Sequence, residues 1–203
     1  MMIPKNLEYL SRPKHLSKFW LDPKDYIKMV VDKIPYTLYR ITYTKDIGDI
    51  IKKGDKGGYV ENVTNLSYDD NSLILGESKV FGNAKVKDNA IVIDSEIYDN
   101  AIIKDNAIIF NNSVVKDNAI VCDNAKIMNG SRIYDNAIIN REAIVYNSVV
   151  ERNAKVSGFA KVLKHSVVSD NAMVLQDGVL FQTTASNNTI INGKGIIKNK
   201  LLC

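Results

Sequence analysis

Histidine and cysteine, the side chains most often used for acid–base and metal chemistry near neutral pH, are few in this chain of 203 residues. The chain has two histidines, His15 and His165, and two cysteines, Cys122 and Cys203. A histidine can act as a general base near neutral pH. The cysteines lie too far apart in sequence to match a metal or redox motif, and we expect no metal site. His165 is the one candidate catalytic residue, and a solvated turn residue is the alternative interpretation.

A six-residue pattern must position these side chains, because it occupies most of the chain. It reads small, any, aliphatic, any, Asp or Gly, then Asn, and it runs from about Ser72 to about Ile197. An aliphatic residue follows the small one by two positions at every step from Ser72 to Gly178. No step is longer than six residues, so no loop is inserted. Two steps are one residue short, namely Ala90 to Ser95 and Ala143 to Ser148.

Each repeat predicts one short strand followed by a corner. Residues two apart in a strand point to the same side, so the small and aliphatic residues share the inward side. The Asp-Asn or Gly-Asn pair supplies a sharp turn, because Asn tolerates a left-handed backbone. Three strands per turn give coils of about 18 residues that stack around a column of Ile, Val, Ala and Ser. We therefore predict an all-β fold, a single-stranded parallel β-helix of about seven triangular coils.

The segment before the repeat predicts a short N-terminal cap made of a helix and a strand. Residues 22–35 fit a helix, with Asp22 as N-cap, Pro23 in the first turn and an apolar stripe behind them. Residues 36–44 alternate in the manner of a strand. A cap is needed because the open end of a β-helix presents unpaired backbone groups.

Two glycine-rich segments could be read as phosphate-binding loops or as turns. The segment 53–58 lacks the spacing and the Lys-Ser/Thr of a P-loop, and we interpret it as part of the cap. The segment 192–195 is interpreted as a turn of the final coil. The chain thus divides into a capping segment, 1–66, and a repeat region, 67–203.

One of the three predicted faces is apolar over its whole length. Its outward positions include Leu75, Ile93, Ile108, Phe110, Met128, Ile144, Tyr146, Leu163 and Phe181. Soluble monomers rarely expose so long a strip, so this face must be covered. Seven strands at ~4.8 Å span roughly 33 Å, whereas a helix of about twelve residues spans roughly 18 Å. We expect partial cover from the N-terminal segment and a second subunit over the rest, with residues 1–21 as the alternative.

The second face is half polar and carries three aromatic residues, Phe81, Tyr98 and Tyr134. Exposed aromatic side chains on a flat, ridged surface suit protein contact. We treat these three residues as a candidate partner face.

Composition restricts the classes of function. The net charge of +4 arises from 27 Lys and Arg against 23 Asp and Glu, and Lys alternates with Asp within the repeats. This arrangement is typical of a solvated face. We therefore do not expect the protein to bind nucleic acid. No stretch approaches the ~20 apolar residues of a membrane span, and the N-terminus lacks a continuous apolar leader. We expect a cytoplasmic protein that does not bind a membrane.

The repeats resemble those of a known family. FGNAKV at 81–86, KDNAIV at 87–92 and YDNAII at 98–103 are similar to the repeats of bacterial and phage hexapeptide-repeat proteins of the YdcK type. The segment GDIIKKGDKGGYVENVTNLS at 48–67 is similar to the entry segment of those proteins. The resemblance implies that the β-helix is left-handed. Members of this family are often labelled transferases, because they share their fold with acyl- and sugar-nucleotide-modifying enzymes.

The resemblance leaves three functions open. The first is a non-catalytic scaffold or protein-binding module of phage or prophage origin that needs no cofactor and binds itself or another protein. The second is an acyltransferase that uses coenzyme A, with His165 as general base between subunits. The third is a viral effector that inhibits a host protein. A three-histidine zinc site, known on this fold, cannot form from two histidines, and the unbroken repeat lacks the inserted loop of such enzymes.

Overall fold

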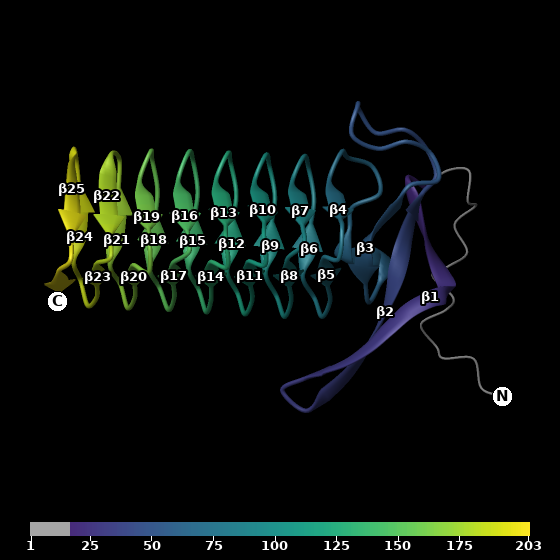
Figure 1. Ribbon diagram of the computed structural model, residues 1–203, viewed down its shortest axis with the longest axis horizontal. Coiled ribbons are helices and arrows are strands. Elements are labelled where there is room, and N and C mark those ends of the chain that lie inside the picture. The colour runs from purple at the N-terminus through teal and green to yellow at the C-terminus, as the bar shows by residue number, and fades with distance from the viewer. Residues whose placement is uncertain (1–16) are drawn as a thin grey trace.

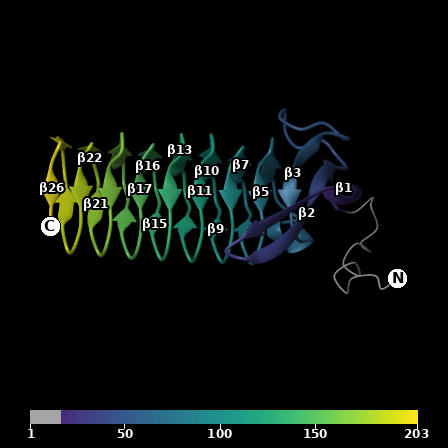
Figure 2. The same ribbon diagram turned by 60° about the horizontal axis from the view of Figure 1, so that its bottom comes forward.

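The computed structural model describes residues 17–203 and shows an elongated parallel β-solenoid with a hairpin at its N-terminal end (Figure 1). Three sheets run along the solenoid, and the successive strands of one coil belong to different sheets (Figure 2). The prediction of an all-β fold is confirmed. The eight strands of one sheet come close to the seven coils that the repeat predicts.

We name the three sheets after their position and composition. The hairpin sheet contains, in spatial order, β1 (Phe19–Val31), β2 (Ile34–Tyr43), β3 (Lys56–Val60), β5 (Lys79–Val80), β8 (Glu96–Ile97), β11 (Val114–Val115), β14 (Arg132–Ile133), β17 (Val149–Val150), β20 (Val167–Val168), β23 (Thr184–Ala185) and β26 (Leu201–Leu202). The apolar sheet contains β4 (Leu73–Leu75), β7 (Ile91–Ile93), β10 (Ile108–Phe110), β13 (Lys126–Met128), β16 (Ile144–Tyr146), β19 (Lys161–Leu163), β22 (Gly178–Phe181) and β25 (Gly195–Lys198). The third sheet contains β6 (Lys85–Val86), β9 (Ile102–Ile103), β12 (Ile120–Val121), β15 (Ile138–Ile139), β18 (Lys155–Val156), β21 (Met173–Leu175) and β24 (Ile190–Asn192). One short 3₁₀ helix, η2 (Val63–Asn65), precedes β4.

The core is a continuous column of small and branched side chains. Parallel pairing places Ile109 beside Ile127, and Ile127 beside Val145 in the following coil. All three are completely buried, as are the alanines two residues before them. Branched residues suit short strands, and burying one such side chain contributes roughly 1.5–3 kcal/mol. The inward side assigned to the small and aliphatic positions of the repeat is therefore confirmed.

Residues with a left-handed backbone close the corners on either side of the third sheet, and in the first half of the solenoid most of them are Asp. Asp88, Asp105 and Asp123 have φ angles of 63°, 59° and 59°, in a region that costs an L-residue about 1–2 kcal/mol. The carboxylates offset this cost by bonding from coil to coil. The backbone N–H of Asp105 donates to Asp88 at 3.1 Å, and that of Asp123 donates to Asp105 at 3.2 Å.

The Asn that follows each corner Asp has a different role from the one expected. We assigned the left-handed backbone to Asn, but the positive φ lies on the preceding Asp. The Asn side chains instead form an exposed ladder, in which Nδ2 of Asn89 donates to Asn106 at 3.1 Å and Nδ2 of Asn106 donates to Asn124 at 3.0 Å. A corner in which Asp and Asn stand together thus links neighbouring coils twice.

Residues 22–35 form most of an antiparallel hairpin, so the prediction of a helix was wrong. Strands β1 and β2 pair from Phe19 and Tyr43 to Val31 and Ile34. Two residues with positive φ, Asp32–Lys33, close the loop in the manner of a type I′ turn. The same apolar residues fit a helical stripe and a strand, and a partner strand ten residues long decides for the strand. The strand expected at 36–44 is confirmed as part of β2.

The hairpin covers the beginning of the hairpin sheet. Leu38, Tyr59 and Phe81 form a small buried cluster beneath it. The ring of Tyr36 lies 4.8 Å from that of Phe81, which is completely buried. The expectation that Phe81 is exposed on a partner face was therefore wrong, because the predicted helix left no hairpin to cover it. The apolar sheet is covered only at its start, where Leu73 is buried although its partner Ile91 in the next strand is partly exposed. The cover expected from residues 1–21 lies mostly outside the described residues.

The first coil is sealed by side chains of β1–β3 and by two glycines. The Tyr43 hydroxyl accepts the N–H of Ile74 at 3.0 Å within the core, where burial raises the Tyr43 pKa. A Cβ at Gly57 would lie 2.6 Å from the carbonyl oxygen of Ile74, and one at Gly58 equally close to that of Ser78. Close packing therefore explains these glycines of the 53–58 segment.

An ion pair between a buried lysine and a partly exposed aspartate joins the start of β1 to the first coil. Lys18 is completely buried, and its Nζ donates to Asp70 at 2.9 Å and to the carbonyl oxygen of Ser72 at 2.8 Å. Burial lowers the pKa of Lys18 and outweighs the effect of Asp70. Burial alone would raise the pKa of Asp70, but hydrogen bonds from Ser72 and Lys18 prevail and lower it to about 2.

We predict that substitutions of Asp105 separate the energetic contribution of the left-handed backbone from that of the side-chain hydrogen bond. Asp105→Asn keeps a side-chain acceptor and a residue that tolerates positive φ, so the free energy of unfolding should change least. Asp105→Gly keeps only the backbone freedom, and Asp105→Ala loses both, which should cost about 1–3 kcal/mol in total. Urea denaturation measures the series, and equal losses for Gly and Ala would contradict the backbone contribution.

We also predict acid sensitivity at Asp70. Its folded pKa of about 2 lies below the ordinary 3.8, so its contribution to stability is complete above pH ~4 and is lost as the pH falls toward 2. Asp70→Asn should therefore flatten the decline of unfolding free energy between these pH values. Denaturation at several pH values measures this, and parallel curves for the two proteins would refute it.

Candidate protein-binding surfaces

The outer face of the apolar sheet carries an uninterrupted row of large apolar side chains. Parallel pairing places one of them on each of seven successive strands, where each is partly exposed. These residues, which we call the apolar row, are Leu75, Ile93, Phe110, Met128, Tyr146, Leu163 and Phe181. The other expected members of this face, Ile108 and Ile144, lie beside the row and are also partly exposed. The structure thus brings all nine residues onto one face.

Basic residues accompany this face. Lys126 and Lys161 are exposed within the neighbouring row of the same sheet. Lys164 lies 5.3 Å from the ring centre of Tyr146, and Lys198 lies 5.7 Å from that of Phe181. These cation–π contacts hold the ammonium groups beside the aromatic rings, so the rim of the apolar row is positive.

Serine replaces alanine at every third repeat because one corner of the coil uses a hydroxyl group. This corner lies between the apolar sheet and the hairpin sheet. Ser148 Oγ donates to the carbonyl oxygen of Tyr146 at 2.9 Å and accepts the N–H of Ser166 at 3.2 Å. Ser131 and Ser166 donate in the same way to the ends of their strands. The serines thus provide between coils the link that aspartate provides at the other corners.

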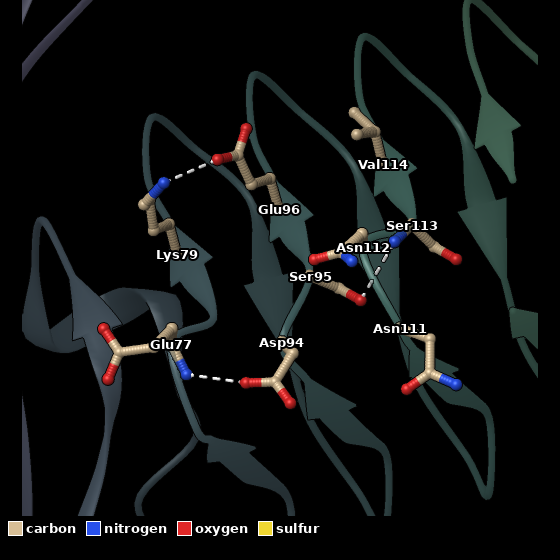
Figure 3. A pocket seen from close by; sticks show the side chains of 9 residues that line it. All are labelled: Glu77, Lys79, Asp94, Ser95, Glu96, Asn111, Asn112, Ser113 and Val114. Atoms are coloured by element: carbon tan, nitrogen blue, oxygen red, sulfur yellow. Dashed lines mark hydrogen bonds and ion pairs between the residues drawn. The ribbon is translucent and has the colours of Figure 1, made fainter. Parts of the chain in front are cut away.

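The serine corner is uneven and forms a hollow of about 590 Å³ near the N-terminal end (Figure 3). Three successive serine corners line the hollow. The middle one has a single residue, Asp94, between its strand and its serine, whereas the corners before and after it have two residues there. The hollow is lined by Glu77, Lys79, Asp94, Ser95, Glu96, Asn111, Asn112, Ser113 and Val114. The charged groups are already engaged, since Lys79 pairs with Glu96 at 2.7 Å and the Glu77 carboxylate pairs with Arg40 at 2.9 Å. The Asp94 carboxylate accepts the N–H of Glu77 at 2.9 Å. The hollow therefore offers no free charge that would select a ligand.

His165 stands at the same corner and is exposed. Its Nε2 lies 3.4 Å from the side-chain amide of Asn147, and its backbone N–H donates to the Asn147 carbonyl. Among the residues that the structure describes, no carboxylate forms a hydrogen bond with the His165 ring. The imidazole therefore lacks the partner that would orient it as a general base. The other histidine, His15, lies outside the described residues.

Tyr98 and Tyr134, the remaining members of the candidate partner face, are partly buried. The Tyr98 ring stacks on Phe81 with centres 4.8 Å apart, and burial raises the pKa of Tyr98 to about 12. Lys116 lies 5.7 Å from the Tyr98 ring centre and 5.2 Å from that of Tyr134. This surface is thus a lysine bracketed by two tyrosines, and it is smaller than the face expected from three exposed aromatics.

Within residues 17–203, one group of side chains has the composition of a metal site. Ligand atoms of Asp105, Cys122 and Asp123 lie within 4.8 Å of one another. Both carboxylates already accept backbone N–H groups of the following coil. Burial, with Asp123 nearby, raises the pKa of the Cys122 thiol, which disfavours the thiolate that binds metals. The group is accounted for as part of the corner.

Comparison with known proteins finds no family model and no curated protein that matches this chain. Within the described part of the chain, no helix is long and apolar enough to cross a membrane. The parallel β-solenoid with its Asn ladders is consistent with a hexapeptide-repeat β-helix. The surfaces themselves must therefore indicate the function.

We predict that the serine corner contributes measurably to stability. Ser148→Ala removes one donor and one acceptor and leaves the N–H of Ser166 without its partner, which should cost about 1–3 kcal/mol of unfolding free energy. Ser157→Ala is the matched control, because Ser157 is also buried but its hydroxyl makes no hydrogen bond in the structure. Chemical denaturation of both variants tests this, and equal losses would show that the hydroxyl link is unimportant.

Proposed function

We propose that this protein is a non-catalytic scaffold that binds another protein through the outer face of the apolar sheet. The observation that carries the proposal is the apolar row, seven large side chains in register without a polar interruption. Contiguous apolar strips of this length are typical of interaction surfaces. Its aromatic members, Phe110, Tyr146 and Phe181, recur on every second strand, and aromatic residues and Met are enriched at interfaces.

The architecture supports this use of the face. Every strand of the apolar sheet pairs on both sides except the two at its ends, so the backbone under the apolar row is held in place. A preorganised surface loses little conformational entropy when a partner binds. The lysines at its margin, among them Lys126 and Lys161, would remain at the rim and favour a partner with acidic groups around an apolar centre.

Two other surfaces support binding less well. The surface of Tyr98 and Tyr134 is small, because Phe81 is buried beneath the hairpin. His165 has only an amide beside its ring, which gives the acyltransferase hypothesis no oriented base. The apolar row is larger than either and needs no rearrangement to reach a partner.

We predict that a photo-crosslinking amino acid at Phe110 captures one defined protein in cells that produce this chain. The same amino acid at Tyr134, on another face, is the control and should capture little. The captured protein, once purified, should bind the wild-type chain and bind Tyr146→Glu at least about tenfold more weakly, because a charge in an apolar interface is costly. Tyr134→Glu should bind as the wild type does.

Two results would overturn this proposal. One is an absence of crosslinks from position 110 under conditions in which the protein is folded and abundant. The other is a captured protein whose affinity is the same for wild type and Tyr146→Glu.

A further inference from the structure

The hairpin sheet ends on one side at β1, whose outer edge pairs with no strand among residues 17–203. This edge strand has thirteen residues, which is long for a strand. In Figure 1 the tip of the hairpin extends beyond the coils, so the solenoid does not block access to it. An exposed edge strand presents unpaired N–H and C=O groups that can accept another strand.

The first half of β1 is guarded against such pairing, and the second half is not. A register shift separates Leu21 from Tyr26, and Pro23 lies within it. Asp22 and its neighbour Asp25 are held there by Lys56 at 3.2 and 3.5 Å. Bulges, prolines and charges are the devices that protect sheet edges. From Tyr26 to Val31 the pairing is regular, and Lys28 is the one charged residue.

The register of the hairpin shows which backbone groups face the open edge. A two-residue loop closes on a hydrogen-bonded pair, here Val31 with Ile34. Hydrogen-bonded and non-bonded pairs then alternate along an antiparallel ladder. Val30, Lys28 and Tyr26 therefore direct their N–H and C=O groups outward. Pro35, which lacks an N–H, lies opposite Val30 at a non-bonded position, as this assignment requires.

The side chains of this segment are divided in the same way. Ile27, Met29 and Val31 pack against the cluster under the hairpin. On the opposite face Tyr26 is 48% exposed and Val30 is 69% exposed. The residues with outward backbone groups thus also carry exposed apolar side chains.

We propose that a second copy of this chain pairs with this edge, so that Tyr26–Val30 of both copies form an antiparallel ladder about a two-fold axis. An axis at Lys28 places Tyr26 of each copy opposite Val30 of the other. Pairs of an aromatic and a β-branched residue stabilise antiparallel strands. Because the segment complements itself, one surface suffices for a closed dimer. The hairpin sheets of the two copies then become continuous.

This arrangement places the two Lys28 side chains opposite each other, and the resulting repulsion gives the dimer a recognisable behaviour. Like charges across a ladder weaken it, and salt screens them. The dimer should therefore tighten as NaCl rises from about 50 mM to about 500 mM. Lys28→Thr should tighten it further and remove most of this salt dependence.

We would test the proposal by measuring mass against concentration with light scattering. Val30→Pro removes an outward N–H and no hydrogen bond of the hairpin, so it should weaken the dimer about tenfold or more, since two symmetric bonds are lost. Val30→Thr keeps the N–H and the branched side chain and should dimerise nearly as the wild type does. Val30→Lys provides a second test, because it changes only an exposed side chain and should also weaken the dimer.

The outcomes separate this proposal from the proposed function. A wild-type monomer at all concentrations would overturn it, as would a dimer that Val30→Pro and Val30→Lys leave unchanged. A dimer abolished by Tyr146→Glu but not by either Val30 variant would show that the copies meet through the apolar sheet. Conversely, a failed crosslinking experiment at Phe110 leaves the prediction for Val30 as it stands.

Discussion

The structure depends on one local constraint, the sharp corner that returns the chain to the next sheet after every few residues. Such a corner forces an L-residue into a left-handed backbone. The protein meets this requirement by giving the corner residue a bond to the next coil. Asp105 does so through its own carboxylate, and at the serine corner the bond comes from the hydroxyl of Ser148, which follows Asn147 with its positive φ. This requirement explains the six-residue repeat, because the polar corner residue and the inward aliphatic residue must recur together.

The same constraint leaves the outward positions free. Neither corner bonds nor core packing depends on the identity of the side chain at Phe110 or Lys126, although the two lie in neighbouring strands of one sheet. The composition of an outer face is therefore less constrained by the fold than that of the core. An apolar row on one sheet, beside mixed faces on the other two, is a property that folding does not require. This independence of core and surface is why the face carries the functional proposal.

The sequence predicts the structure well within the repeat and poorly outside it. Inside the repeat, strands, inward residues and the apolar face could all be predicted, because one spacing rule governs them. Outside it, the stripe that includes Ile27, Val30 and Val31 fitted a helix as well as a strand, and only the partner strand β2 decided the outcome. Burial of Phe81 followed from that hairpin and could not be foreseen without it. A third short step, from Gly178 to Thr183, escaped notice because glycine and threonine stand where alanine and serine mark the others.

The variation in coil length affects how the corners line up. Leu73 pairs with Ile91, eighteen residues later, and Ile91 pairs with Ile108, seventeen residues later, yet the strands stay in register. The single missing residue is absorbed at the serine corner alone. A whole coil is therefore a module whose cross-section does not depend on its neighbours, and tandem duplication or loss of one coil would lengthen or shorten the protein without disturbing the fold. The reach of the apolar row is in this sense a quantity that evolution can adjust in increments of one strand spacing, about 4.8 Å.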